Sequence, residues 1–306
     1  MESFYKKLKK SEDGNTIILM ALAMSAMIAM VGLVIDGGNL FVSKSHLQKT
    51  ANAAALSGAQ EIVNSEANVK EVVNQILALH EEQNSSLQVN IEPNSQLHVE
   101  VTKDVPLYFA TLFGIDSVPI TVDAKAIVNP MGEAKGAVPL GINDSVNLDY
   151  GETYELKVDA GDSISGNFGV LALEGPGAKT YEETLKHGFD ESLKVGDIVN
   201  TQTGNIAGKT KAGIDYRIAN CPYPDGDYQE RDCPRVMLII VYKPHPTENK
   251  QIKSVEITGF AYFYVNQQMS NTDDTVKGIF IKRTGPGITG ENSPADRGAY
   301  AIKLEE

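Results

Sequence analysis

An uncharged apolar run near the amino end is the first pattern along the chain. Residues 14–35 contain no Asp, Glu, Lys or Arg. At about 1.5 Å per helical residue they extend for about 33 Å, which is enough to cross a hydrocarbon core. The basic tail 1–13 carries four lysines, so the amino end should stay in the cytoplasm and the bulk of the chain outside. A cleaved signal peptide usually has a shorter apolar region, and we expect a retained single-pass anchor in the cell membrane.

Small residues recur at helical spacing inside this run and beyond it. Ala21, Ser25 and Ala29 stand four residues apart, a spacing that lets a second helix approach closely in lipid. The spacing returns further on at a second group with small and apolar neighbours: Leu47, Ala51, Ala54, Ala55, Gly58 and Ala59. This second stripe either packs on the protein's own domain or contacts other subunits, and the pattern leaves both open. Gly37 and Gly38 are candidates for a kink; without one, the helix would run from Thr16 to Val63.

Periodic patterns after the anchor predict a small α+β unit over residues 36–129. The expected elements are a helix at 68–82, strands at 87–91 and 97–101, a short helix at 106–113 and a strand at 118–128. Residues 130–137, with Pro130, Gly132 and Gly136, have the composition of a linker.

Residues 138–306 have the pattern of a β-rich domain. Six short segments are β-branched or aromatic and are separated by turns: TYELKVDA, GVLAL, RVMLIIVYK, SVEITGFAYFYV, KGIFIKR and AYAIKL. The one clear helical segment is TYEETLKHG, which ends at Gly188. The fold class is therefore α+β: a transmembrane helix that continues into a small α+β unit, followed by a mainly antiparallel β sandwich or barrel.

Charge and cysteine content narrow the possible partners. The net charge of −13 makes nucleic acid an unlikely partner, because an acidic body repels phosphate backbones. The only two cysteines, Cys221 and Cys233, close a short loop, and outside the cytoplasm we expect them to form a disulfide. The loop between them is rich in Asp and Glu, but the order of its acids does not match a calcium-binding EF-hand loop. A solvated acidic loop is the simpler interpretation.

Three candidate catalytic or ligand patterns are weak. GNIAGKT has only three residues between Gly204 and GKT, whereas a phosphate-binding loop needs four, and a turn between strands explains it better. Ser163 and Ser165 lie in a Gly/Asp-rich loop typical of turns, and the proximity of His187 and Asp190 in sequence does not make a triad. The five histidines show no zinc spacing. We therefore expect no enzyme activity, no cofactor and no metal.

The segment around the end of the anchor resembles the Tad (Flp) pilus-assembly proteins of the TadE/TadG-like kind. VGLVIDGGNLF…SHLQKTANAAALSGAQ contains an aspartate and glycine after an apolar helix, then the run LQ-x-x-x-N-A-A-A-L-S-G-A. The matching positions are Asp36, Gly37, Leu47, Gln48, Asn52, Ala53, Ala54, Ala55, Leu56, Ser57, Gly58 and Ala59. YFATLFGIDSVPITVDAKAIV is similar to the family's later F-x-x-x-x-G turn and strand. The resemblance implies pilus or secretion-system subunits as partners, with possible self-association in the lipid.

One feature departs from the prepilins that some members of the family resemble. A prepilin usually carries a glutamate five residues after a glycine cleavage point, but Gly14 is followed by NTIIL. The resemblance therefore implies an assembly component that keeps its anchor.

Two functions of different classes fit these features. The first is a membrane-anchored structural or assembly component of a Tad-type pilus or secretion system, which presents its β domain outside the cell. The second is a membrane-tethered binding module for a carbohydrate, a cell-wall polymer or a protein. Exposed aromatic residues at Phe260, Tyr262 and Tyr264 would favour binding, since aromatic rings stack on sugars, whereas burial would favour the structural role.

Overall fold

The computed structural model describes residues 13–157, 164–165, 168–202, 206–223, 228–245, 252–270, 274–290 and 294–305. The chain divides into two compact units. The first comprises Met1–Ala55, Val73–Asn90 and His98–Ala124, and the second comprises Leu56–Val72, Ile91–Leu97 and Lys125–Glu306. The basic tail up to residue 12 lies outside the described residues.

Helix α2 (Asp13–Ala59) is one continuous helix. It runs through Gly37 and Gly38 without a break, because two glycines cost only about 1 kcal/mol each in a long helix. It ends four residues before Val63, where the backbone tightens into turns with bonds such as Gln60 N–H to Ser57 C=O. Within the described residues, α2 is the one helix long and apolar enough to span a membrane.

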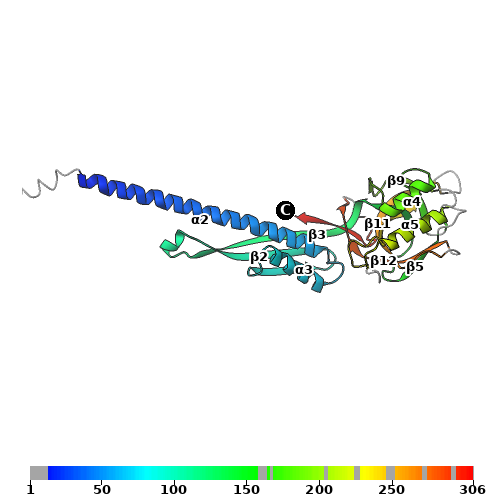
Figure 1. Ribbon diagram of the computed structural model, residues 1–306, viewed down its shortest axis with the longest axis horizontal. Coiled ribbons are helices and arrows are strands. Elements are labelled where there is room, and N and C mark those ends of the chain that lie inside the picture. Colours follow the sequence, from blue (N-terminus) through cyan, green and yellow to red (C-terminus); the bar gives the residue numbers. More distant parts are fainter. Residues whose placement is uncertain are drawn as a thin grey trace, which may run out of the picture. The chain divides into compact units, whose positions relative to one another are not determined.

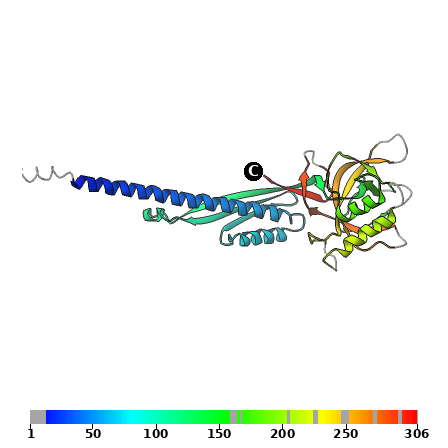
Figure 2. The same ribbon diagram turned by 45° about the horizontal axis from the view of Figure 1, so that its top comes forward.

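The first elements after α2 confirm the predicted α+β pattern, with two corrections. Helix α3 (Glu66–Leu79), strand β1 (Ser86–Glu92) and strand β2 (Gln96–Pro106) follow α2, and the turn between the strands places Asn94 at φ 56°. The helix expected at 106–113 is wrong over most of its length: β2 continues to Pro106, and only a 3₁₀ turn, η1 (Ala110–Phe113), is helical. In Figures 1 and 2, α2 lies alongside β2.

The expected linker at 130–137 is also wrong. Strand β3 (Ser117–Lys135) runs through it, and β4 (Ala137–Asn143) begins two residues later. Three partners pair with this part of β3: β15 (Ala299–Glu305), β14 (Gly287–Thr289) and β8 (Ser192–Lys194). Their hydrogen bonds hold a Pro- and Gly-containing segment extended, which its composition alone does not favour.

Two sheets contain the strands. The first has the order β1-β2-β3-β15-β13, with β14 and β8 paired to β3, where β13 is Arg283–Thr284. The second has the order β10-β4-β7-β9-β11-β12-β5, and β6 (Ile164–Ser165) pairs with β7. The bounds of its other strands are β5 (Thr153–Lys157), β7 (Phe168–Ala172), β9 (Ile198–Thr201), β10 (Val236–Pro244), β11 (Ser254–Val265) and β12 (Thr275–Ile281).

The second sheet closes on itself. Strand β10 pairs with β4 at one edge and also with β11 at the other, so the hydrogen bonds run in a circuit through β10, β4, β7, β9 and β11. A closed circuit is the defining property of a barrel. Among the pairings of this sheet's described strands, β10 with β4 is parallel and the others are antiparallel, as the predicted fold class requires.

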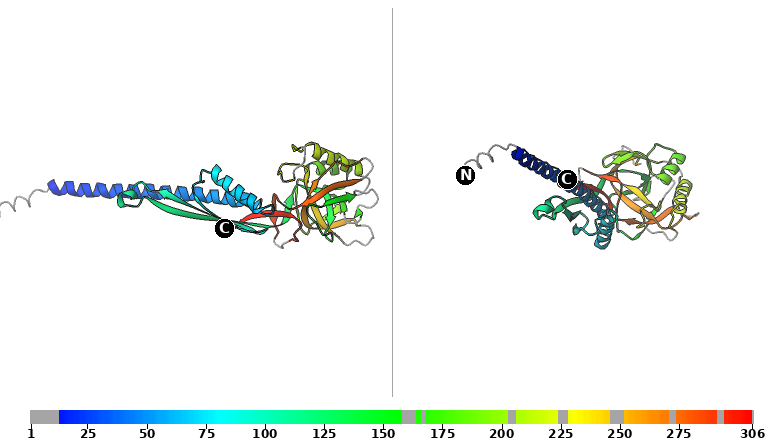
Figure 3. Two further views of the ribbon diagram at one scale, coloured as in Figure 1. Left: turned by 90° about the horizontal axis from the view of Figure 1, so that it is seen from below. Right: turned by 60° about the vertical axis from the view of Figure 1, so that its left-hand side comes forward.

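Two helices belong to the barrel unit (Figures 1 and 3). Helix α4 (Ala178–His187) is the predicted one, while α5 (Ala207–Ala219) replaces the turn expected at GNIAGKT. The two helices pack closely, because a Cβ on Gly213 would lie 2.6 Å from the Leu185 side chain. The Tyr181 hydroxyl and Thr210 Oγ1 are 2.9 Å apart in the buried contact between them.

Strand β11 is buried on both of its faces from Gly259 to Val265. Ala261, Phe263 and Val265 belong to one apolar cluster, which also includes residues of α4 and α5. The alternate residues Phe260, Tyr262 and Tyr264 belong to a second cluster, and none is more than 8% exposed. The possible row of exposed aromatic residues is therefore absent from this strand.

Candidate membrane-anchoring and assembly site

The amino-terminal half of α2 presents apolar side chains on all of its sides. Every large apolar residue from Ile17 to Ile35 is between 44% and 78% exposed. An apolar surface of this extent is unfavourable in water and suits the hydrocarbon core of a bilayer. The structure is consistent with the single-pass anchor expected from the sequence.

The two stripes of small residues on α2 have different surroundings. Ala21, Ser25 and Ala29 are exposed. By contrast, these residues of the second stripe are at most 1% exposed: Leu47, Ala51, Ala54, Ala55 and Ala59. Gly58 is also buried, and Gln48 is half-buried. The Gln48 side-chain amide donates to the Asp123 carbonyl at 2.7 Å and to Asn52 Oδ1 at 3.0 Å, which links α2 to β3 within the first unit.

Asp36 connects the end of the apolar run to the loop between β2 and β3. Its Oδ1 accepts a hydrogen bond from the Tyr108 amide at 2.8 Å, and its Oδ2 accepts from the amides of Phe109 and Ala110 at 3.0 and 2.8 Å. The first amides of a helical turn have no acceptor within that turn, so a carboxylate at this point satisfies them. Only 7% of Asp36 is exposed.

Gly32, one turn before Asp36, makes room for the same loop. A Cβ at this position would lie 2.6–2.8 Å from atoms of Phe109, so any larger residue would displace the phenyl ring. Gly114 then reverses the chain at φ 84°, a left-handed conformation that favours glycine. The Asp-Gly sequence and the F-x-x-x-x-G turn that resemble the family are therefore in direct contact, although about seventy residues separate them.

A groove of about 550 Å³ lies between α2 and this loop. Ile28, Leu33, Leu107 and Leu112 are among the residues that line it, together with Ser25 and Ala29 of the first small-residue stripe. Ser25 and Asp36 are its polar side chains. Both already have partners, since the Ser25 hydroxyl donates to the Ala21 carbonyl at 2.8 Å and Asp36 accepts the loop amides.

Gly37, which follows Asp36 in the motif, is exposed, and a Cβ at this position would meet no atom within 4 Å. Neither Gly32 nor Phe109 was among the residues expected from the sequence to form a site. The signal that could have found Gly32 is its place one helical turn before Asp36, on the same face of α2.

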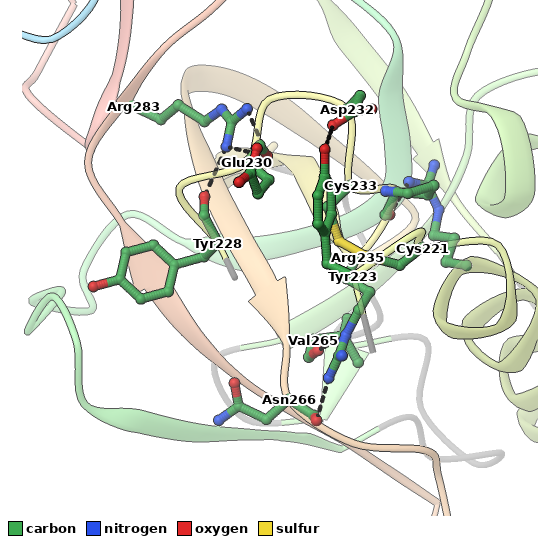
Figure 4. The surroundings of a disulfide bond; sticks show 12 residues. Cys221, Tyr223, Tyr228, Glu230, Asp232, Cys233, Arg235, Val265, Asn266 and Arg283 are labelled. Carbon is green, nitrogen blue, oxygen red and sulfur yellow. Dashed lines mark hydrogen bonds between the residues drawn. A yellow bond between two sulfur atoms is a disulfide. The ribbon is translucent and has the colours of Figure 1, made fainter. Parts of the chain in front are cut away.

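Cys221 and Cys233 form a disulfide in the second unit, with their Cα atoms 4.9 Å apart (Figure 4). The Tyr223 hydroxyl donates to Asp232 Oδ1 at 2.8 Å, and this bond, together with burial, raises the pKa of Tyr223 to about 12. Arg283 donates to the carbonyls of Tyr228 and Glu230 at 2.8 and 3.2 Å.

Two of the acids in the loop between Cys221 and Cys233, Asp225 and Asp227, lie outside the described residues. Among the residues that the structure does describe, no group of three or more His, Cys, Asp or Glu could hold a metal ion.

Three residues of the weak catalytic patterns, Lys209, Thr210 and His187, make structural contacts. Lys209 of GNIAGKT pairs with Glu182 at 2.6 Å, and Thr210 is buried against Tyr181. The His187 ring packs edge-on against Tyr216. Thr203, Gly204 and Ser163 lie outside the described residues, as does the side chain of Ser165.

Residues 14–61 match the family described as putative Flp pilus-assembly TadE/G-like. No curated protein and no solved structure matches the chain. The matched residues contain the apolar run, Gly32, Asp36 and both small-residue stripes, and the match ends two residues after α2. The amino-terminal segment of this chain is therefore similar to the TadE/G-like pilus-assembly family.

Proposed function

We propose that this protein is a membrane-anchored structural component of a Tad (Flp) type pilus or secretion system, with its β-rich unit outside the cell. The observation that carries the proposal is the TadE/G-like match over 14–61, on a helix that exposes apolar and small side chains from Ile17 to Ile35. A helix of this kind is stable in lipid and presents the small residues that allow other helices to approach.

The orientation in the membrane follows from charge. The four lysines before Gly14 favour the cytoplasm for the amino end, which leaves the barrel unit on the outer side. Protease added to intact cells stripped of their wall should therefore digest the barrel unit. Complete protection of that unit would contradict the proposed topology.

We assign the protein no catalytic role. Three of the side chains that suggested chemistry, Lys209, His187 and Thr210, are engaged in an ion pair, a ring contact and a buried hydrogen bond. The alternative role is a membrane-tethered binding module for a carbohydrate, a cell-wall polymer or a protein, and exposed aromatic rings in β11 would have favoured it. Burial of Phe260, Tyr262 and Tyr264 favours the structural role.

Partner subunits would contact the anchor at the small-residue stripe, and the structure shows which position tests this best. Ser25 and Ala29 line the groove beside the loop, so a change there would also disturb the loop. Ala21 lies one turn further along the same face and is not among the groove residues. We expect Ala21→Leu to reduce cross-linking of the protein to other copies or to pilus-assembly subunits, because leucine prevents close helix approach.

A matched control is available on the same helix. Ala23→Leu makes the same change on the opposite side of α2, since two residues turn the helix by about 200°. The experiment is cross-linking in membranes, followed by detergent extraction and identification of the co-purified proteins. Equal yields from Ala21→Leu and Ala23→Leu, or the absence of pilus-assembly proteins from the wild-type sample, would contradict the proposal.

A further inference from the structure

The loop between β2 and β3 has an unusual composition for a loop on a water-soluble surface. No charged residue occurs between Asp104 and Asp116, and the sequence of this stretch is VPLYFATLFGI. Within it we define the tip loop as residues 107–115. Its four most prominent side chains are exposed by 50% to 79%: Tyr108, Leu112, Phe113 and Ile115.

The backbone of the tip loop is largely satisfied without water. Asp36 accepts the amides of Tyr108, Phe109 and Ala110, as described above. Four further amides of the loop donate to backbone carbonyls: those of Leu107, Leu112, Gly114 and Ile115. The Thr111 hydroxyl donates to the Tyr108 carbonyl at 2.9 Å. Each of these pairings lowers the free-energy cost of moving a backbone amide from water into an apolar environment.

The tip loop also lies beside the apolar run of α2 and not beyond its end. Phe109 packs against Gly32, which is inside the uncharged residues 14–35. The groove between loop and helix reaches from Leu40 to Ser25. Ser25 is about 16 Å along the helix axis from Asp36 towards the amino end. The loop therefore lies at the level of the half of the apolar run that is farther from the amino-terminal lysines.

The groove has the chemistry of an acyl-chain site. Its lining is apolar apart from Ser25 and Asp36, and the hydrogen bonds of both are already made inside the protein. A polar ligand would therefore find no free side-chain partner among these lining residues. Apolar chains would cover Ile28, Leu33 and Leu112 without loss of any hydrogen bond.

We propose that the tip loop inserts into the lipid bilayer beside the anchor helix, so that the protein enters the leaflet farther from its amino end with two segments. Lipid acyl chains cover Leu112 and Phe113 and fill the groove. Asp104 and Asp116 flank the loop at the bilayer surface, where their charges remain in water. The proposal rests on the membrane anchoring proposed above, and it commits to lipid because the loop is continuous with an exposed apolar helix of membrane-spanning length.

The natural absence of tryptophan makes a direct test possible. Phe113→Trp places a single fluorophore at the tip of the loop in the full-length protein. Met30→Trp places one in the apolar run as a positive control. Leu79→Trp, at the end of α3, is matched to Phe113 in exposure, at 78% against 79%, and serves as the control for water. Each variant is reconstituted into phosphatidylcholine vesicles with and without bromine on the acyl chains.

We expect bromine to quench Phe113→Trp as strongly as Met30→Trp and to leave Leu79→Trp unquenched. The emission of Phe113→Trp should also be shifted to shorter wavelength than that of Leu79→Trp. Quenching of Met30→Trp but not of Phe113→Trp would overturn the inference. In that case, short-wavelength emission from Phe113→Trp would mean that a second protein chain covers the loop. Long-wavelength emission would mean that the loop is exposed to water. If Met30→Trp is not quenched either, the anchoring itself is wrong, and both proposals fail together.

Discussion

The two halves of α2 carry small residues at the same spacing but use them differently. In the amino-terminal half, Ala21, Ser25 and Ala29 are exposed, and two of them line a groove. In the carboxyl-terminal half, Ala51 and Ala55 are completely buried. The spacing of small residues shows only that another segment can pack closely against a helix. Which segment packs there depends on the path of the rest of the chain.

The junction between the two halves contains the most specific contacts. Gly32 and Asp36 lie one turn apart and both contact the tip loop, Gly32 by its lack of a side chain and Asp36 through three backbone amides. The exposed half of α2 precedes this junction and the buried half follows it. Changes at the junction and in each half should therefore have separable effects.

The largest effect is expected at Asp36. Asp36→Ala leaves three amides of the tip loop without an acceptor, and hydrogen bonds to a charged group contribute about 1.5–3 kcal/mol each. Hydrogen exchange of the Tyr108, Phe109 and Ala110 amides should become faster by orders of magnitude. Asp36→Asn keeps one acceptor oxygen and should lose less protection. Unchanged exchange in Asp36→Ala would show that the loop holds its conformation without the carboxylate.

The second effect separates the two halves directly. Ala55→Leu adds volume at a site with no exposed surface, and overpacking costs about 1–3 kcal/mol. The melting temperature of the detergent-solubilised protein should therefore fall. Ala21→Leu makes the same change in the exposed half and should leave that temperature unchanged. Equal shifts for the two variants would show that the halves do not differ in packing.

A smaller effect is expected for two glycines that lie five residues apart in α2. Alanine is favoured over glycine in a helix by about 1 kcal/mol, and a Cβ on Gly37 meets nothing within 4 Å. Gly37→Ala should therefore raise the melting temperature slightly. Gly32→Ala gains the same preference but forces Phe109 to move, so it should lower the melting temperature. A rise for both variants would mean that Phe109 is not held against Gly32.

The smallest effect concerns pH at the residues that follow α2. Burial raises the pKa of Glu61, but hydrogen bonds from Arg231 at 2.9 Å and Asn64 at 2.6 Å outweigh it and keep the pKa below its ordinary value of 4.5. A carboxylate with a lowered pKa stabilises the fold above its unfolded pKa, and this contribution is lost as pH falls through the folded pKa.

Because Arg231 is 41% exposed, we expect the Glu61 contribution to be under about 1 kcal/mol. The melting temperature of the wild-type protein should decrease as the pH falls below about 4.5, and it should decrease less in Arg231→Gln. The same pH dependence in wild type and variant would exclude a role for this ion pair.

The pattern of neighbouring residues predicted those helices and strands whose formation follows from hydrophobic periodicity. The apolar run, the helix with the pattern TYEETLKHG and five strands of the barrel sheet (β5, β7, β10, β11 and β12) are visible in sequence, because hydrophobic periods of about 3.6 and 2 residues reflect burial directly. Strands β4 and β9 of the same sheet were missed. Pairing partners are not visible in this way. The strand through Pro130 and Gly132 depends on β15, β14 and β8, which come from distant parts of the chain.

The burial of both faces of β11 was equally inaccessible to pattern analysis. An uninterrupted apolar strand such as GFAYFYV is compatible with an exposed aromatic row or with a strand between two layers. Only the packing of α4 and α5 on one side, and a second apolar cluster on the other, decided between them. Helix α5 was missed because its hydrophobic period is weak. Four of its residues are buried, but Ile214 is the only large apolar residue among these four.

The sequence by itself predicted a helix long and apolar enough to span a membrane, a segment similar to the TadE/G-like family and a β-rich unit, because hydropathy and period are properties of neighbouring residues. Only the tertiary structure decided what the small residues and Asp36 contact. Asp36 and Phe109 are 73 residues apart, and they meet because β2 returns along α2 and places an apolar turn against Gly32. Contacts of this kind depend on the path of the whole chain, which no local pattern contains.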